Sequence, residues 1–166
     1  MKKTKFLVLS ALIAAAYAVS TLVLAPISFG AVQLRLSEAL TILPVFTPAA
    51  IPGLAIGCFI SNIMSPFGII DMVFGTLATL LAAIFTYKLR YLKYKGIPLL
   101  SPLPPVLFNA FIVGTVTAVG TGAFLSAFFI SFGLIFISQL IVCYLGGIPL
   151  YIGISKLIKS GKINIF

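Results

Sequence analysis

A long stretch without any charged side chain, residues 96–155, limits most strongly what this chain can fold into. Only 8% of the 166 residues are charged and 61% are hydrophobic, and the mean hydropathy is +1.27. A water-soluble domain of this size needs roughly 25% charged residues to face water. The composition therefore excludes a soluble globule and predicts an all-α protein that crosses a membrane several times.

The positive charges lie in three short clusters. The chain has 11 Lys and Arg against 2 Asp and Glu, a formal net charge of +9. Basic clusters at the ends of membrane segments follow the positive-inside rule, so they indicate cytoplasmic loops and argue against nucleic-acid binding. The clusters comprise Lys2, Lys3 and Lys5; Lys88, Arg90, Lys93 and Lys95; and Lys156, Lys159 and Lys162.

Proline and glycine divide the apolar sequence into six predicted transmembrane segments. We expect helices at about 6–26, 34–46, 51–64, 69–87, 99–119 and 124–157, within a single integral membrane domain, 1–166. Six crossings place both termini and the loop 88–95 in the cytoplasm. The second and third segments are shorter than the roughly 20 residues of a spanning helix. The alternative is that these two segments form a re-entrant hairpin that does not cross the membrane. The number of crossings would then fall from six to four, and both termini would still lie in the cytoplasm.

The N-terminus imitates a signal peptide, because lysines precede an apolar run and Ala16-Tyr17-Ala18 resembles a cleavage site. The apolar run continues to Ala25, however, beyond the 7–15 residues or so of a signal-peptide core. We therefore expect a retained first helix, with cleavage as the alternative.

The scarce polar residues of the predicted membrane segments indicate a binding site. Charged groups inside a bilayer are costly and need a functional or structural reason. Six crossings bring Arg35, Glu38 and Asp71 to the outer face, where two uncharged polar residues join them, and Asn109 lies near mid-membrane. The candidate ligand-binding residues are Gln33, Arg35, Glu38, Asn62, Asp71 and Asn109.

Each candidate residue also has a purely structural interpretation. Arg35 and Glu38 are three residues apart and could form an ion pair within one helix. Asp71 could stabilise a helix N-terminus, Asn62 could end a helix, and Asn109 could form a hydrogen bond between helices. The sequence leaves these alternatives open.

Small residues indicate which helices touch. Ala11, Ala15 and Ala18 share one face of the first segment, as do Ala14 and Ala18, and the fourth segment carries a similar stripe from Gly75 to Ala83. Such spacing lets another helix approach closely. The stripes predict either packing inside this chain or a docking face, at Ala11, Ala14, Ala15 and Ala18, for a separate membrane subunit.

Several kinds of chemistry have no residues to support them. Histidine is absent and no phosphate-binding P-loop motif occurs, so we expect no enzyme, no metal site and no cofactor. Cys58 and Cys143 are interpreted as small hydrophobic residues. Gln139 is interpreted as a hydrogen-bonding residue between helices. The remaining possibility is a small membrane protein that binds a ligand in a polar pocket on its outer side.

Three ordered motifs carry a resemblance to a known family. They are the runs 33–44 (QLRLSEALTILP), 51–62 (IPGLAIGCFISN) and 71–79 (DMVFGTLAT). Together they resemble the QueT family of substrate-binding (S) components of energy-coupling factor (ECF) transporters. The resemblance covers roughly residues 1–160.

The resemblance implies a six-helix S-component bundle in the bacterial plasma membrane, with a pocket on the extracellular side. The implied substrate is a queuosine precursor, a deazaguanine base. The implied partners are a transmembrane coupling subunit, which docks on the alanine stripe, and two cytoplasmic ATPases. A stand-alone permease for a small molecule and a structural subunit of a membrane complex remain alternatives.

Overall fold

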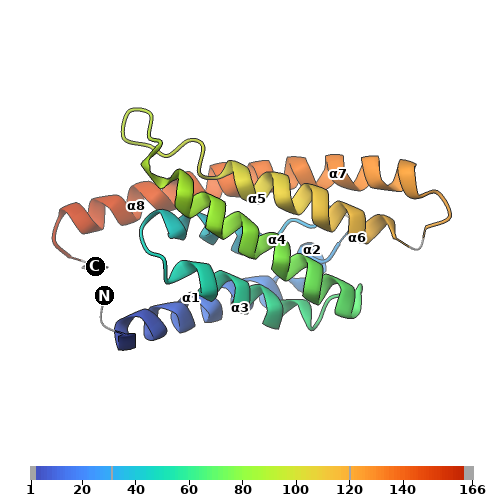
Figure 1. The fold of residues 1–166 in the computed structure, drawn as a ribbon, viewed down its shortest axis with the longest axis horizontal. Helices are drawn as coiled ribbons and strands as arrows, with labels where there is room; N and C mark the ends of the chain where they lie inside the picture. Colours follow the sequence, from blue (N-terminus) through green and yellow to red (C-terminus); the bar gives the residue numbers. More distant parts are fainter. Residues whose placement is uncertain (1–2, 31, 120, 163–166) are drawn as a thin grey trace.

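The computed structural model describes residues 3–30, 32–119 and 121–162. Within these ranges the chain forms helices and no strand, and most helices run along the long axis of the molecule (Figure 1). Helices suit a chain this apolar, because they satisfy the backbone hydrogen-bonding groups where no water is present.

Three helices of the described chain are long and apolar enough to cross a membrane. The third of them, Phe124–Lys159, is built from three consecutive elements. The elements of the three helices are α1 (Lys3–Val23); α4 (Gly68–Lys88) with its extension η2 (Leu89–Tyr91); and α7 (Phe124–Ile141), η4 (Val142–Gly146) and α8 (Gly147–Lys159).

The remaining helices are shorter. The segment Leu103–Ala118 is also composite. The short elements are α2 (Ala25–Ser28), η1 (Leu36–Val45), α3 (Ala50–Asn62), α5 (Leu103–Phe108), η3 (Asn109–Val113) and α6 (Gly114–Ala118).

Element η1 is a 3₁₀-helix where the sequence predicted an undivided helix over 34–46. Pro44 lies inside it and lacks the N–H that an α-helical bond would need. A 3₁₀-helix rises about 2.0 Å per residue and brings side chains at i and i+3 into line. Glu38, Thr41 and Pro44 therefore share one line, and all three are buried.

Two π-helical turns interrupt helices that the sequence predicted as regular. One is η3, which begins at Asn109, and the other is η4, which contains Cys143. The second π turn, Val142–Gly146, ends immediately before Gly147, where α8 begins. Each π turn changes which residues face the bundle interior, and such turns are frequent at functional sites.

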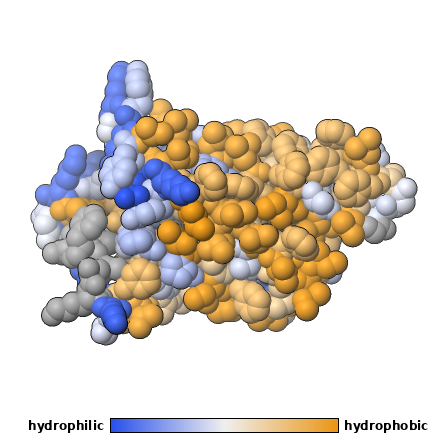
Figure 2. Space-filling model, viewed as in Figure 1, coloured by the Kyte–Doolittle hydropathy of each residue, from blue (hydrophilic) through white to orange (hydrophobic). Residues whose placement is uncertain are grey.

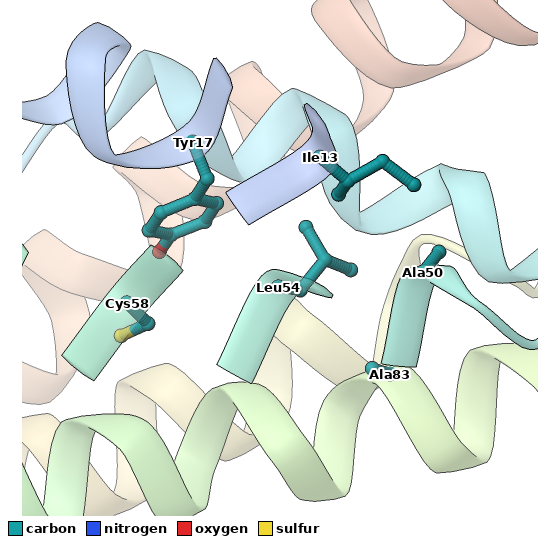
Figure 3. Packing of buried hydrophobic residues seen from close by; sticks show 6 residues of the cluster. All are labelled: Ile13, Tyr17, Ala50, Leu54, Cys58 and Ala83. Carbon is teal, nitrogen blue, oxygen red and sulfur yellow. The ribbon is translucent and has the colours of Figure 1, made fainter. Parts of the chain in front are cut away.

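The interior is formed around η1, which packs against α1, α3, α4, α8 and η4. Figure 3 shows the adjoining apolar cluster, in which Tyr17 and Ile13 of α1 meet α3. Close approach of α1 and α3 depends on glycine, because a Cβ at Gly57 would lie 2.7 Å from the Ala14 carbonyl oxygen. The cluster consists of Ile13, Tyr17, Ala50, Leu54, Cys58 and Ala83.

The surface divides into an apolar body and a hydrophilic end (Figure 2). The hydrophilic end is the one where α1 begins, α8 ends and the loop between η2 and α5 projects (Figure 1). Large hydrophobic side chains such as Leu12, Phe129 and Leu145 are exposed over the rest. This surface suits lipid rather than water, and the protein is a membrane protein.

Candidate functional site

The polar residues that the sequence singled out lie inside the bundle. They come from the ends of several elements: the segment before η1, the first turn of η1, the end of α3, the start of α4 and the start of η3. The six candidates Gln33, Arg35, Glu38, Asn62, Asp71 and Asn109 are at most 3% exposed. We call these six residues the polar cluster.

One half of the polar cluster is an ion pair. The Arg35 guanidinium donates from Nη2 to Asp71 Oδ2 at 3.1 Å and approaches Gln33 Oε1 at 3.4 Å. The Ser65 hydroxyl donates to the same Asp71 oxygen at 2.6 Å. The Phe29 ring lies against the guanidinium, 5.2 Å from its central carbon to the ring centroid. The charge of Asp71 is thus balanced within the chain.

Asn62 joins α3 to the start of α4. Its amide nitrogen donates to the backbone oxygen of Asp71 at 3.0 Å and approaches Cys58 Sγ at 3.5 Å. Thr79 also donates to Cys58 Sγ, at 3.3 Å. Gly75 makes room for this arrangement, because a Cβ there would lie 2.6 Å from Asn62 Nδ2 and 2.9 Å from Asp71 Oδ1.

The other half of the polar cluster surrounds Glu38. Its Oε1 accepts a short hydrogen bond from the Tyr17 hydroxyl of α1. Asn109 lies beside the Glu38 carboxylate and donates to Gln139 Oε1 of α7 at 3.3 Å. Cys143 in η4 approaches the same Gln139 oxygen at 3.6 Å. The two π turns thus bring polar groups of α7, η3 and η4 to the first turn of η1.

Five of the six residues of the polar cluster carry a buried polar atom that has no hydrogen-bond partner in the described part of the chain. Two of these atoms are donors and three are acceptors. Leaving such a group unpaired costs about 1–3 kcal/mol each, so this many in one place indicates a site that a polar ligand completes. The unpaired atoms are Gln33 Nε2, Arg35 Nε, Glu38 Oε2, Asn62 Oδ1 and Asp71 Oδ1.

The structure distinguishes between several interpretations of the candidate residues that the sequence left open. Arg35 and Glu38 do not form the ion pair that their spacing allowed, because Arg35 precedes η1 and its guanidinium contacts Asp71. Asp71 lies in the first turn of α4. The hydrogen bond expected between helices is present and joins Asn109 to Gln139. Asn62 does end α3 and also binds the backbone of α4.

Sequence reasoning missed Tyr17, Ser65 and the role of the cysteines. Cys58 and Cys143 were interpreted as small hydrophobes, yet their sulfur atoms lie within 3.9 Å of polar side chains. A usable signal existed for Tyr17. It shares a buried polar stripe of α1 with Ser10 and Thr21 at helical spacing.

The structure divides the predicted alanine stripe of α1. Ala14 and Ala18 are buried within this chain, at 5% and 7% exposure, and Ala14 faces Gly57 of α3. Ala11 and Ala15 are exposed. On α4 the small residues Gly75, Ala78, Thr79, Ala82 and Ala83 are all buried and serve internal packing.

A surface hollow elsewhere has a different character. It has a volume of about 550 Å³ and is lined only by apolar side chains, among them Phe85, Leu107 and Phe132. Such a lining offers no hydrogen bonds to a heterocyclic ligand and suits an acyl chain. The polar cluster is therefore the candidate site, even though it is closed in this structure.

A lipid-facing helical bundle around a closed, incompletely paired polar cluster is the architecture of an integral membrane protein with a candidate site for a small polar ligand. Comparison with known families agrees, since the model of the family described as QueT transporter matches residues 7–156. The chain belongs to the QueT transporter family.

One curated relative is the protein named queuosine precursor transporter QueT of Lactococcus lactis subsp. cremoris (strain MG1363). It is 40% identical over 84 residues, which are 48% of this chain and 49% of the relative. The match thus spans about half the length of that protein. No solved structure matches this chain.

Proposed function

We propose that this protein is the substrate-capture subunit of an ECF-type importer and binds a queuosine precursor, a deazaguanine base, from outside the cell. Membership of a transporter family and the name of the Lactococcus relative support a small-molecule cargo of this kind. In this proposal a coupling transmembrane subunit and two cytoplasmic ATPases power release into the cytoplasm.

The proposed topology has six crossings of the bacterial plasma membrane with both termini cytoplasmic. The hydrophilic end of the molecule, which carries the lysines of α8 and of the loop after η2, supports this orientation (Figure 2). In this proposal the closed polar cluster becomes accessible from the other side, the direction from which a nutrient arrives.

The observation that carries the proposal is the set of five unpaired polar atoms in the polar cluster. A guanine-like base presents N–H groups beside a carbonyl oxygen and a ring nitrogen. The carboxylate and amide oxygens of the cluster can accept from those N–H groups, while Arg35 Nε and Gln33 Nε2 can donate to the base. An analogue that lacks these N–H groups and acceptor atoms would leave the buried groups of the protein unpaired and would bind poorly.

The first experiment is calorimetric titration of deazaguanine bases into the purified protein in lipid nanodiscs. Gln33→Ala removes one unpaired donor and should weaken binding by about tenfold, the value of one typical hydrogen bond. Ser126→Ala, at an exposed position of α7, is the control and should bind as the wild type does. Failure of every such base to bind would reject the proposed substrate.

The second experiment separates an importer subunit from the alternatives. We expect uptake of labelled base into proteoliposomes only when the coupling subunit and ATPases are present with ATP. Uptake by this chain alone would indicate a stand-alone permease. Absence of both a ligand and uptake would leave a structural subunit.

A further inference from the structure

Four lysines from two distant segments line one hollow at the hydrophilic end of the molecule. Lys93 and Lys95 belong to the loop between η2 and α5, and Lys156 and Lys159 belong to the last turn of α8. The hollow has a volume of about 410 Å³, within the roughly 300–1,000 Å³ of small-ligand pockets. We call it the basic pocket. Basic residues at the ends of membrane helices are common, but that rule does not require two segments to meet at one hollow.

The charge of the basic pocket is not balanced by acidic side chains of this chain. The sequence contains two acidic residues, Glu38 and Asp71. Both are fully buried in the polar cluster, whereas the four lysines of the pocket are exposed. The four positive charges therefore attract an anion from outside the chain.

The loop side of the basic pocket has a fixed shape. Tyr94 and Ile97 exchange two backbone hydrogen bonds, at 2.9 and 3.0 Å. The two residues between them, Lys95 and Gly96, have positive φ angles of 49° and 82°, as in the type I′ turns of β-hairpins. The Tyr151 hydroxyl of α8 donates to the Gly96 backbone oxygen at 3.2 Å and holds this turn against the helix. The pocket is thus built without a ligand.

The lining of the basic pocket is partly apolar. Ile97 and Ile152 contribute aliphatic side chains, and Ser155 contributes a hydroxyl group. The Lys93 ammonium lies 5.7 Å from the centroid of the Tyr151 ring. Such a lining suits an anion that carries a hydrocarbon part, because aliphatic side chains gain nothing from contact with a bare ion.

The basic pocket lies at the level where membrane helices end. Two of the candidate spans, Gly68–Tyr91 and Phe124–Lys159, end next to it. Figure 2 shows the apolar body giving way to hydrophilic side chains at this end of the molecule. Lipid headgroups lie at this depth, beside the hydrocarbon core, and basic pockets between membrane helices bind the headgroups of anionic lipids.

We propose that the basic pocket binds the headgroup of an anionic phospholipid, and that a headgroup with two phosphates, as in cardiolipin, binds best. The four ammonium groups contact the phosphates, and the aliphatic side chains contact the glycerol carbons. In the proposed topology the lipid belongs to the cytoplasmic leaflet. This lipid site is separate from the polar cluster and does not depend on the identity of the cargo.

The first experiment is native mass spectrometry of the whole protein in mild detergent, titrated with cardiolipin, phosphatidylglycerol or phosphatidylcholine. Cardiolipin should bind most tightly and the zwitterionic phosphatidylcholine most weakly. The double variant Lys156→Gln with Lys159→Gln should bind cardiolipin about 30-fold more weakly, because each lysine beside an anionic lipid contributes about fivefold. The control is Lys3→Gln with Lys162→Gln. It removes the same charge from exposed lysines outside the pocket and should bind cardiolipin as the wild type does.

A second variant tests the shape of the basic pocket rather than its charge. Tyr151→Phe removes the hydrogen bond to Gly96 and keeps every lysine. It should weaken cardiolipin binding about fivefold, within the value of one hydrogen bond, and leave phosphatidylcholine binding unchanged. Thermal unfolding in the same detergent checks that the variant is folded. Wild-type affinity of a folded Tyr151→Phe for cardiolipin would reject the pocket as a built site.

Three other outcomes would overturn the proposal. If the double variant and its control lose affinity equally, net charge alone attracts the lipid. If inorganic pyrophosphate displaces cardiolipin at equal concentration, the pocket takes a soluble anion. If all three lipids bind equally and the Lys156 and Lys159 double variant no longer co-purifies with the coupling subunit, the pocket contacts an acidic protein surface.

Discussion

At the scale of single residues, Gly75 and Tyr17 hold the polar cluster in shape. Gly75 lies one helical turn after Asp71 on α4 and leaves the space that the Asn62 amide occupies. Tyr17 is fully buried and supplies the hydrogen bond that Glu38 receives from α1. Neither residue is a charged or amide residue, and those were the residue types that indicated a site in the sequence.

We predict that Gly75→Ala abolishes ligand binding. Its methyl carbon would lie 2.6 Å from Asn62 Nδ2 and 2.9 Å from Asp71 Oδ1, and such overpacking costs about 1–3 kcal/mol. Calorimetric titration and thermal unfolding measure both effects. Gly133→Ala in α7 is the control, because a Cβ there meets no atom within 4 Å. Normal binding by Gly75→Ala would show that the Asn62–Asp71 geometry is not needed.

We predict that Tyr17→Phe lowers the free energy of unfolding by about 1–3 kcal/mol, because it leaves buried Glu38 Oε1 without its donor. The double variant Tyr17→Phe with Glu38→Gln should regain part of this loss, since an uncharged amide is less costly to bury. Denaturant unfolding in mild detergent measures the cycle. Strictly additive losses would mean that the two side chains do not depend on each other.

Several residues of the site were predictable from sequence for a simple physical reason. Charged and amide side chains are rare in this chain and costly in lipid, so Arg35, Glu38 and Asp71 stand out. Tyr17 does not stand out by residue type, because tyrosine and phenylalanine together number 21 (6 and 15), and only its helical spacing from Ser10 and Thr21 could have marked it. The pairing of Arg35 was also missed, because it depends on a tertiary contact with α4 across 36 positions of sequence.

At the scale of elements, α1 has two faces with different uses. The face with Ala14 and Ala18 is buried, and the backbone of Ala14 lies next to Gly57 of α3. The face with Ala11 and Ala15 is exposed and remains available for the proposed coupling subunit. Sequence spacing could not separate the two faces, because alanine at i and i+4 fits either use.

We predict that Ala15→Leu leaves the fold and the ligand affinity unchanged and prevents co-purification with the coupling subunit. Ala14→Leu should instead destabilise the isolated chain by about 1–3 kcal/mol through overpacking against α3. Pull-down with the tagged coupling subunit, alongside thermal unfolding, measures both. Leu12→Phe, on an exposed position, is the control. Undiminished co-purification of Ala15→Leu would exclude this face from the interface.

Element boundaries were predictable where proline and glycine interrupt the apolar sequence, and the helix types were not. The 3₁₀ form of η1 accommodates Pro44, whereas no local sequence signal marks the π turns η3 and η4. Residues Leu36–Val45 are apolar enough for several helical forms. Tertiary contacts select among these forms.

At the scale of the whole molecule, the lysine-rich end and the apolar body predict the orientation in the membrane. We expect Lys93→Cys and Ser160→Cys to react with a membrane-impermeant thiol reagent only from the cytoplasmic side. Thr121→Cys should react only from outside. All three positions are exposed, and the native Cys58 and Cys143 are buried and should stay silent. Labelling of positions 93 and 121 from the same side would reject the proposed topology.

A further labelling position distinguishes six crossings from four with a hairpin. Pro48 is exposed and lies between η1 and α3. If both elements cross, Pro48→Cys should be labelled from the cytoplasmic side, like Lys93→Cys. In a re-entrant hairpin it would lie within the membrane and escape the reagent from both sides.

The closure of the polar cluster has a consequence for the speed of capture. Since all six side chains are at most 3% exposed, a solute colliding with this conformation does not reach the polar cluster. Capture must wait for a spontaneous opening, so in rapid-mixing experiments the observed association rate should reach a plateau as solute concentration rises. The plateau rate would equal the rate at which the bundle opens. Release of the bound solute would require the same opening, so the opening rate would also limit how long the solute stays bound.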